Sequence, residues 1–401
     1  MLAKTERNVS IVVMLVQFTH VLDFVVLMPL GQILMRKLGI TTLEFATLVS
    51  SYNISAAFVG LVAGVWIDRI ERKKFLLVCY AGFIAATLMC GLSSTFTVFL
   101  IARIIAGAFG GLTNSAVYSI IGDYVNPHGR GEATGIVMSS FSIASVAGVP
   151  LGLHLANLYN WEMTFFFIVG LSLLIFLLCL VYLPKIEVVK EGKTSLNKTF
   201  KNYTRIAFSA KAFWGLALMA TVSCSSFVII PFISPFVVGN LGFSETDLKY
   251  IYLFGGIATL ASSRLVGRWC DRWGANRIYI IFSLLACIPG IVFTNLNHSS
   301  MAFTLVITSM FMVLFSSRFI PVLTLMNSIP SNTDRGAFLT LSNSTRTFAV
   351  AFASWIGGYI VSHDLTSNKL VGYNISGWVS VALTVLSILI LRQLNKNYKL
   401  I

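Results

Sequence analysis

Two ionisable side chains, His20 and Asp23, lie within the apolar stretch "FTHVLDFVVLMPLG" at residues 18–31. Because they are three positions apart, both project from one face of any helix that forms there. A charged group at the centre of a membrane helix costs about 2.5 to 3.5 kcal/mol on insertion scales, so such groups face the protein interior or a water-filled path. The pattern predicts proton chemistry at Asp23. His20 is either a relay for that proton or a histidine that only packs between helices.

Three arginines, Arg103, Arg318 and Arg346, occupy comparably deep positions in other apolar stretches. A movement that changed the distance between Asp23 and an arginine would change whether Asp23 holds a proton. The alternative is a permanent ion pair that only orders the helices. One acid against three arginines leaves an excess of positive charge. This excess favours an anionic ligand that bears a carboxylate or a phosphate over a lipophilic cation.

Membrane-spanning helices must position these residues. Of the 401 residues, 56% are hydrophobic and only 11% are charged, which is outside the range of soluble domains. The charge-free runs 75–92 and 165–183 are long enough to cross about 30 Å of hydrocarbon as helices. We predict an all-α membrane protein with about twelve transmembrane helices. The predicted spans lie near 9–33, 44–67, 75–93, 97–124, 133–157, 163–184, 212–238, 247–268, 277–296, 300–328, 337–361 and 374–392.

The positive charges indicate how the chain crosses the membrane. Most of the 29 lysines and arginines fall in segments on the same side as the N-terminus, and the opposite loops hold Arg36, Lys37, Lys249 and Lys369. This bias predicts that both termini are cytoplasmic. It also accounts for the net charge of +14 through topology and lipid headgroups, without a nucleic-acid partner. The six cysteines show no CxxC spacing, so neither a metal site nor disulfides are predicted.

The chain repeats itself once. The segment "GVWIDRI" at 64–70 returns as "GRWCDRW" at 267–273, and a polar, basic stretch lies between the two halves. We predict an N-terminal six-helix bundle at 1–184, a cytoplasmic linker at 185–211 and a C-terminal six-helix bundle at 212–401. In such pseudo-symmetric transporters the substrate site lies near the membrane midplane between the halves.

Several motifs resemble those of the major facilitator superfamily, and together they cover nearly the whole chain. The pattern Gly-x-x-x-Asp-Arg-x-x-Arg-Lys-Lys at 64–74 is similar to the family's signature loop, and 267–274 is similar to its weaker second copy. Arg103-x-x-x-Gly107 resembles the family's second motif, and "AGVPLGLHL" at 147–155 resembles the glycine-proline motif of its proton antiporters. The closest subgroup is the twelve-helix efflux proteins of the arabinose-efflux type. Glu71 and Glu162 depart from the family pattern, which weakens inference of the substrate from the subgroup.

The resemblance implies roles for the residues in these motifs. Spans one, four, seven and ten of the family surround its central cavity, which implies that Asp23, Arg103 and Arg318 line it. The signature loop implies a latch that holds the outward-facing state together. Its expected members are Gly64, Asp68, Arg69 and Arg72, with Gly267, Asp271 and Arg272 in the second copy. The alternative role for these basic residues is positive-inside anchoring alone.

Two further groups of residues have both a functional and a packing interpretation. Gly148, Pro150 and Gly152 predict a kinked, tightly packed helix, with either an antiporter role or a role in packing only. Four aromatic residues of the C-terminal half could form an amphipathic wall of the substrate cavity, although most of the 31 phenylalanines are expected to face lipid or pack between helices. These four residues are Phe227, Phe232, Phe236 and Tyr252.

We therefore predict a secondary active transporter that couples proton movement to the efflux of a small amphipathic or anionic organic molecule by alternating access. The expected energy source is the proton gradient, without a cofactor, and we expect a monomer in the inner (cytoplasmic) membrane. A facilitator, an uptake porter or a lipid flippase on the same fold remains as an alternative. A membrane enzyme is disfavoured because no HExxH or Gly-x-Ser-x-Gly arrangement occurs. A sensor on this fold would be expected to carry an added soluble domain.

Overall fold

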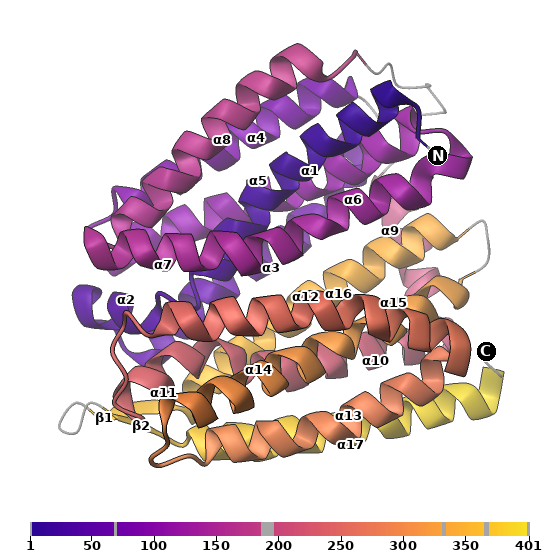
Figure 1. Cartoon of the computed structure of the whole chain (residues 1–401). Coiled ribbons are helices and arrows are strands. Elements are labelled where there is room, and N and C mark those ends of the chain that lie inside the picture. The colour runs from indigo at the N-terminus through magenta and orange to yellow at the C-terminus, as the bar shows by residue number, and fades with distance from the viewer. Residues whose placement is uncertain (1, 68–69, 186–195, 331–333, 365–368, 399–401) are drawn as a thin grey trace. The chain divides into compact units, whose positions relative to one another are not determined.

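The computed structural model describes residues 2–67, 70–185, 196–330, 334–364 and 369–398, and almost all of its regular structure is helical (Figure 1). The chain folds into two compact units. The first unit comprises Met1–Leu30 and Ser51–Thr199, and the second comprises Gly31–Ser50 and Phe200–Ile401. The predicted all-α membrane fold is confirmed at the level of its helices.

The first unit is built from long helices joined by short turns. Its core lies between α1, α4, α5 and α8, where side chains such as Val13, Tyr80, Phe83 and Val117 are completely buried. Within this core, a 2.8 Å hydrogen bond between the Tyr80 and Thr19 hydroxyls joins α4 to α1. The elements are α1 (Lys4–Val26), the later part of α3 (Thr42–Ile67), α4 (Arg72–Gly91), α5 (Phe96–Tyr124), η1 (Pro127–Gly129), α6 (Arg130–Ile143), η2 (Ala144–Gly148), α7 (Val149–Leu158) and α8 (Glu162–Tyr182).

The second unit contains the remaining helices and a two-stranded antiparallel hairpin, in which His363 pairs with Leu370. Asn240 fixes the hairpin through its side chain, which donates to the Leu370 carbonyl and accepts from the Leu370 N–H. The elements are α2 (Gly31–Leu38), the start of α3, α9 (Leu196–Ala207), α10 (Ala210–Phe227), η3 (Ile230–Phe232), α11 (Ile233–Gly239), α12 (Leu248–Trp273), α13 (Ala275–Thr294), α14 (Met301–Ser317), α15 (Phe319–Ser328), α16 (Arg335–Ile360), β1 (Ser362–Asp364), β2 (Lys369–Val371) and α17 (Tyr373–Tyr398).

Contacts within the chain also group segments that lie far apart in the sequence, and the predicted division into two six-helix bundles with a linker stays a prediction. Residues 31–50 group with the second unit, where the Thr42 hydroxyl donates to the Val361 carbonyl (2.6 Å) and the Ser50 hydroxyl donates to the Ala351 carbonyl (2.7 Å). The predicted linker at 185–211 contains the helix α9, which groups with the second unit from Phe200 onward. The two hydroxyl hydrogen bonds join residues that are 319 and 301 positions apart in the chain, and a hydropathy pattern cannot register such contacts.

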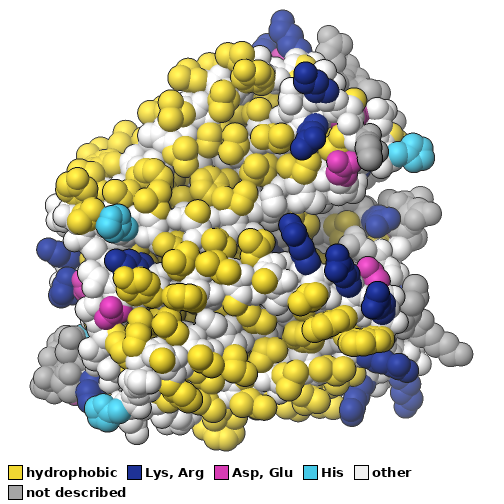
Figure 2. All heavy atoms as spheres, viewed as in Figure 1, with side chains coloured by type: hydrophobic (Ala, Val, Ile, Leu, Met, Phe, Trp, Pro, Cys, Tyr) yellow, Lys and Arg dark blue, Asp and Glu magenta, His cyan; other side chains and the backbone are white. Residues whose placement is uncertain are grey.

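Within the described residues, ten segments are long and apolar enough to cross a membrane. The predicted spans 247–268 and 337–361 correspond to α12 and α16, which are 26 residues long but less apolar than the ten. Apolar side chains such as Leu174, Leu177 and Val181 on α8 are exposed along the helix flank. Figure 2 shows apolar side chains over the helix flanks and lysines and arginines toward the helix ends in each unit. This distribution is the one expected of a multi-pass membrane protein.

Prolines interrupt four of the predicted spans. A proline has no N–H for the carbonyl four residues earlier, and its ring clashes with that carbonyl. The α-helices α10 and α14 end at Phe227 and Ser317, each four residues before a proline (Pro231 and Pro321). In the same way, α1 ends next to Val25, four residues before Pro29, and the π-helix η2 contains Val146, four residues before Pro150. The predicted spans 9–33, 133–157, 212–238 and 300–328 are therefore each built from more than one helix.

Candidate functional site

Asp23 on α1 and Arg103 on α5 form an ion pair inside the first unit. The Arg103 Nη1 atom donates to Asp23 Oδ2 at 2.8 Å, and both side chains are completely buried. The hydrogen bonding of the pair is incomplete, because Asp23 Oδ1 and Arg103 Nε and Nη2 have no partner among the described residues. Such a pair is costly to bury and has free sites for a proton or a further polar group.

Tyr52 on α3 packs against this ion pair. The Arg103 guanidinium carbon lies 4.2 Å from the centroid of the Tyr52 ring, which is cation–π geometry. The Tyr52 ring also stacks on Phe24, with the ring centroids 5.8 Å apart. Gly107, one turn after Arg103, allows this approach, because a Cβ there would lie 2.2 Å from the Tyr52 carbonyl oxygen. Sequence reasoning missed Tyr52, because nothing in the sequence pairs a tyrosine of the second predicted span with a glycine of the fourth.

His20 lies one helical turn before Asp23 but forms no hydrogen bond with it. Its ring packs between Tyr52 and Phe83, with centroid distances of 6.1 and 5.9 Å. Both ring nitrogens are shielded from solvent and lack a partner among the described residues. Gly110 makes room for the imidazole, because a Cβ at this position would lie 2.7 Å from His20 Nε2. The contacts match the packing interpretation, and the role of His20 as a relay stays a prediction.

Arg318 occupies a different environment, in the second unit. Its side chain is completely buried at the break between α14 and α15. Nη1 donates to the Thr384 hydroxyl (2.9 Å) and Nη2 donates to the Ser226 hydroxyl (3.0 Å). The guanidinium carbon lies 4.1 Å from the centroid of the Phe315 ring, and Nε has no partner among the described residues.

The two hydroxyls are oriented to accept from Arg318 because their own protons are already used. The Thr384 hydroxyl donates to the Ser380 carbonyl (2.8 Å), and the Ser226 hydroxyl donates to the Val222 carbonyl (3.1 Å). No ion pair between Arg318 and a carboxylate occurs within the described parts of the chain. The cation is thus solvated by hydroxyl groups and a ring, without a formal negative charge. No motif in the sequence indicated Ser226 or Thr384, since serine and threonine are common in membrane helices.

The remaining predicted substrate residues do not join Arg318 in one cluster. Arg346 on α16 is exposed and its Nη2 donates to Asn343 one turn earlier (3.1 Å). Phe232 and Phe236 are buried in the second unit, where Phe232 meets Phe45 and Phe236 meets Tyr373 at a centroid distance of 4.6 Å. Their burial favours the packing interpretation over an open ligand wall. Phe227 and Tyr252 are half-buried.

The signature-loop residues are only partly described. Gly64 lies in α3, whereas Asp68 and Arg69 fall outside the described residues. Arg72, the first residue of α4, donates through Nε to Asp123 Oδ2 near the end of α5 at 2.6 Å. Sequence reasoning missed Asp123, although its place just before the end of a span was visible. In the second copy, Asp271 and Arg272 are exposed near the end of α12 and Gly267 is half-buried.

The glycine-proline motif packs closely on α1. A Cβ at Gly148 would lie 2.6 Å from Leu22 Cδ1, and one at Gly152 would lie 2.8 Å from Val26 Cγ2. Pro150 is the second residue of α7, which begins directly after the π-helical turn η2. The motif therefore holds an irregular helix against the segment that carries Asp23. Among the described residues no group of three His, Cys, Asp or Glu side chains could hold a metal ion.

Comparison with known proteins agrees with these features. The sequence matches the Major Facilitator Superfamily over residues 13–354 and again over 216–397. Multidrug resistance protein 1 of Bacillus subtilis (strain 168) is 22% identical over 367 residues, which are 90% of this chain and 92% of that protein. The match to the family spans most of the chain. It indicates a multi-pass membrane transporter and not an enzyme.

Two solved structures are similar to the whole chain. The human organic anion transporter MFSD10 (TETRAN) has a TM-score of 0.74 at 16% identity, over 96% of this chain and 99% of that one. A D-xylose-proton symporter has a TM-score of 0.76 at 17% identity, over 98% of this chain and 97% of that one. At these identities the structures support the fold alone. The sequence match over most of its length shows that the chain belongs to the Major Facilitator Superfamily.

Proposed function

We propose that this transporter couples proton movement to the export of a small amphipathic or anionic organic molecule, and that Asp23 is the coupling group. The observation that carries the proposal is the completely buried Asp23–Arg103 pair with unsatisfied atoms on both residues. An ion pair with a purely structural role is stabilising only when its remaining hydrogen bonds are made. The free Oδ1, Nε and Nη2 atoms are sites at which a proton or a substrate group can compete with the pair.

Coupling follows from the charge of Asp23. Ionised Asp23 holds the Arg103 guanidinium against the Tyr52 ring, whereas protonated Asp23 carries no charge to hold it. The two protonation states thus favour different arrangements of α1 and α5, as alternating access requires. A relative named for multidrug resistance supports export, and a proton symporter with the same fold supports the use of protons.

The surplus positive charge supports an anionic substrate class. Arg103 is neutralised by Asp23, but Arg318 has only hydroxyl and ring partners among the described residues and its Nε is free. A guanidinium without a carboxylate suits the carboxylate or phosphate of a ligand. The solved organic anion transporter of the same fold is in keeping with this class. We further propose a monomer in a bacterial inner membrane, with both termini cytoplasmic.

The test of coupling is the change Asp23→Asn, which keeps the size of the side chain but cannot be deprotonated. In proteoliposomes with an imposed pH gradient, we expect the variant to lose uphill accumulation while it retains downhill exchange. Glu132→Gln is the matched control. Glu132 is exposed, and the side-chain amide oxygen of the introduced glutamine can still accept the hydrogen bond from the Leu2 N–H. If the Asp23→Asn protein still concentrates substrate against its gradient, Asp23 is only a structural ion-pair partner. The coupling group must then be sought at His20 or elsewhere.

The test of the substrate class is Arg318→Gln. Loss of a hydrogen bond from a charged donor costs about 1.5 to 3 kcal/mol, so binding of an anionic ligand should weaken by roughly tenfold to a hundredfold. A panel of organic anions, neutral sugars and lipophilic cations, measured at fixed pH, identifies the class. Arg264→Gln is the control, because Arg264 on α12 is exposed. Equal weakening for neutral and anionic ligands would count against a charge-specific role.

A further inference from the structure

A pocket of about 300 Å³ lies at one end of the second unit, where α9, α10, α15 and α16 meet. Its floor is apolar and includes Ile206, Ile329 and Phe338, all of which are buried. Its rim is charged and includes Arg205, Lys211 and Asp334. The pocket therefore combines an apolar base with two cations and one anion. None of these residues belongs to the Asp23 or Arg318 clusters.

The pocket lies at the level where membrane spans end. One candidate span begins at Ala210, next to the pocket residues Ser209 and Lys211. Another span ends at Ser328, next to the pocket residues Ile329 and Pro330. The ends of spans lie among the lipid headgroups. Phe208, in the turn between α9 and α10, is 82% exposed, so a large apolar ring lies uncovered beside the pocket residue Ser209.

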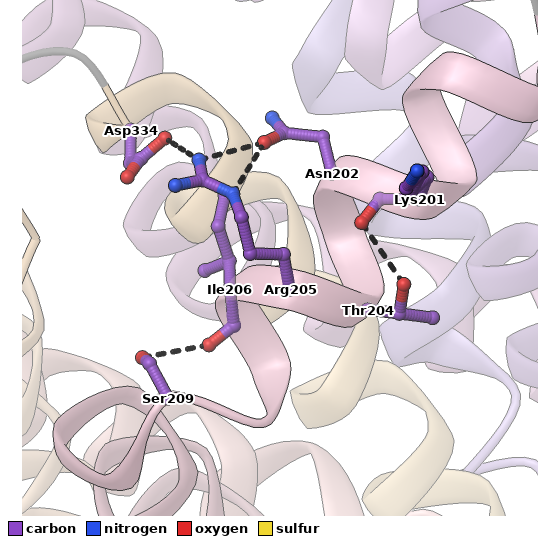
Figure 3. A network of polar contacts seen from close by, with 7 residues as sticks. All are labelled: Lys201, Asn202, Thr204, Arg205, Ile206, Ser209 and Asp334. Carbon is purple, nitrogen blue, oxygen red and sulfur yellow. Dashed lines mark hydrogen bonds and ion pairs between the residues drawn. The ribbon is translucent and has the colours of Figure 1, made fainter.

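The Arg205 guanidinium is held in place but is not fully used. Nη2 donates to Asp334 Oδ1 (2.6 Å) and to Asn202 Oδ1 (2.8 Å), and Nε donates to the same Asn202 oxygen at 3.3 Å (Figure 3). Nη1 forms no hydrogen bond within the described part of the chain. Asp334 and Asn202 thus fix the plane of the guanidinium and leave one of its edges free.

Lys211 contributes a second cation with spare donors. Its ammonium group makes one long contact, 3.5 Å, to the Ser328 carbonyl at the end of α15. An ammonium has three donors, so it can bind an oxyanion while it keeps this contact. Basic pockets between helices at the membrane interface bind anionic lipid headgroups.

We propose that this pocket binds the phosphate of an anionic phospholipid, held between Arg205 Nη1 and the Lys211 ammonium. The apolar floor accepts the glycerol and the first methylene groups of the lipid. The bound lipid ties the helix α9 to α10, α15 and α16. This site is independent of the substrate and of proton coupling.

The experiment measures lipid binding to the purified, intact protein in detergent by native mass spectrometry. Phosphatidylglycerol, phosphatidylcholine and glycerol 3-phosphate are titrated separately. We expect preferential binding of phosphatidylglycerol to the unmodified protein. Each basic residue near an anionic lipid contributes about fivefold, so Arg205→Gln with Lys211→Gln should weaken the first phosphatidylglycerol by roughly 30-fold.

The matched control removes two positive charges elsewhere. Arg392 and Lys396 are exposed on α17 and outside the pocket, so Arg392→Gln with Lys396→Gln should keep the tight first lipid. Equal loss in both double variants would overturn the proposal in favour of general surface attraction. Tight binding of glycerol 3-phosphate alone would overturn the lipid assignment in favour of a soluble phosphate ligand. Thermal unfolding of each variant identifies any that is misfolded, and in that case Lys211→Gln alone is compared with Lys396→Gln.

Discussion

At the scale of single residues, the two arginines that are completely buried within the described residues, Arg103 and Arg318, are stabilised by different partners. Arg103 has a carboxylate at 2.8 Å, whereas Arg318 has two hydroxyls and a phenyl ring. A full opposite charge gives the stronger interaction, but a single proton can neutralise the carboxylate and so break the pair. Hydroxyls cannot be neutralised in this way. The environment of Arg103 therefore changes when Asp23 is protonated, whereas the environment of Arg318 contains no carboxylate that a proton could neutralise.

A double-mutant cycle measures the energy of the Asp23–Arg103 pair. Arg103→Gln leaves the Asp23 carboxyl buried without its cation, which typically costs about 3 to 5 kcal/mol of unfolding free energy. Asp23→Asn with Arg103→Gln removes both charges, so the double variant should be more stable than the sum of the single changes predicts. We expect a coupling energy of about 0.5 to 3 kcal/mol, measured by unfolding in detergent. Strict additivity would mean that the two side chains do not stabilise each other.

At the scale of elements, proline breaks and small residues position the site. Arg318 is the residue between α14 and α15, a break that Pro321 produces by leaving the Ser317 carbonyl without its helical donor. In the first unit, glycines on α5 let the backbone of α3 come close. A Cβ at Gly111 would lie 2.5 Å from the Ala56 carbonyl oxygen. This contact and the similar one at Gly107 hold Tyr52 against Arg103.

Gly107→Ala tests the close approach of α3 and α5. The added methyl group meets the Tyr52 backbone and must push the helices apart, which should cost about 1 to 3 kcal/mol. Gly122→Ala in the same helix is the control. A Cβ at that position meets nothing within 4 Å, and alanine should stabilise the helix there by roughly 0.5 to 1 kcal/mol. Unfolding midpoints in detergent compare the two variants, and equal stability would show that α3 and α5 can separate freely.

At the scale of the whole molecule, orientation in the membrane follows from the distribution of lysine and arginine. Lys201→Cys on the exposed face of α9 should react with a membrane-impermeant maleimide only from the cytoplasmic side. His298→Cys, exposed in the turn before α14, should react only from the outside. The native cysteines are buried or half-buried, so the unmodified protein is the control. Labelling of residue 201 in intact cells would show that the protein has the opposite orientation to the one proposed.

The sequence by itself determined the class of the protein. A chain this apolar must satisfy its backbone inside hydrocarbon, which leaves helices as the expected structure, and the positions of Asp23, Arg103 and Arg318 within apolar runs marked them as buried. The repeat at 64–70 and 267–273 indicated the family that the comparison then confirmed. These features depend on composition and local order, and both are visible along the chain.

Only the tertiary structure decided which side chains contact the buried charged residues. The sequence indicated three deep arginines as possible ion-pair partners of Asp23, and in the folded structure Arg103 forms the pair. It also gave Arg318 its hydroxyls from α10 and α17 and enclosed Phe232 and Phe236 in the core of the second unit. A serine or phenylalanine on a membrane helix has the same local pattern whether it faces lipid, a neighbouring helix or a buried charge. Contacts between residues far apart in the chain distinguish these environments, because they depend on how the helices are packed.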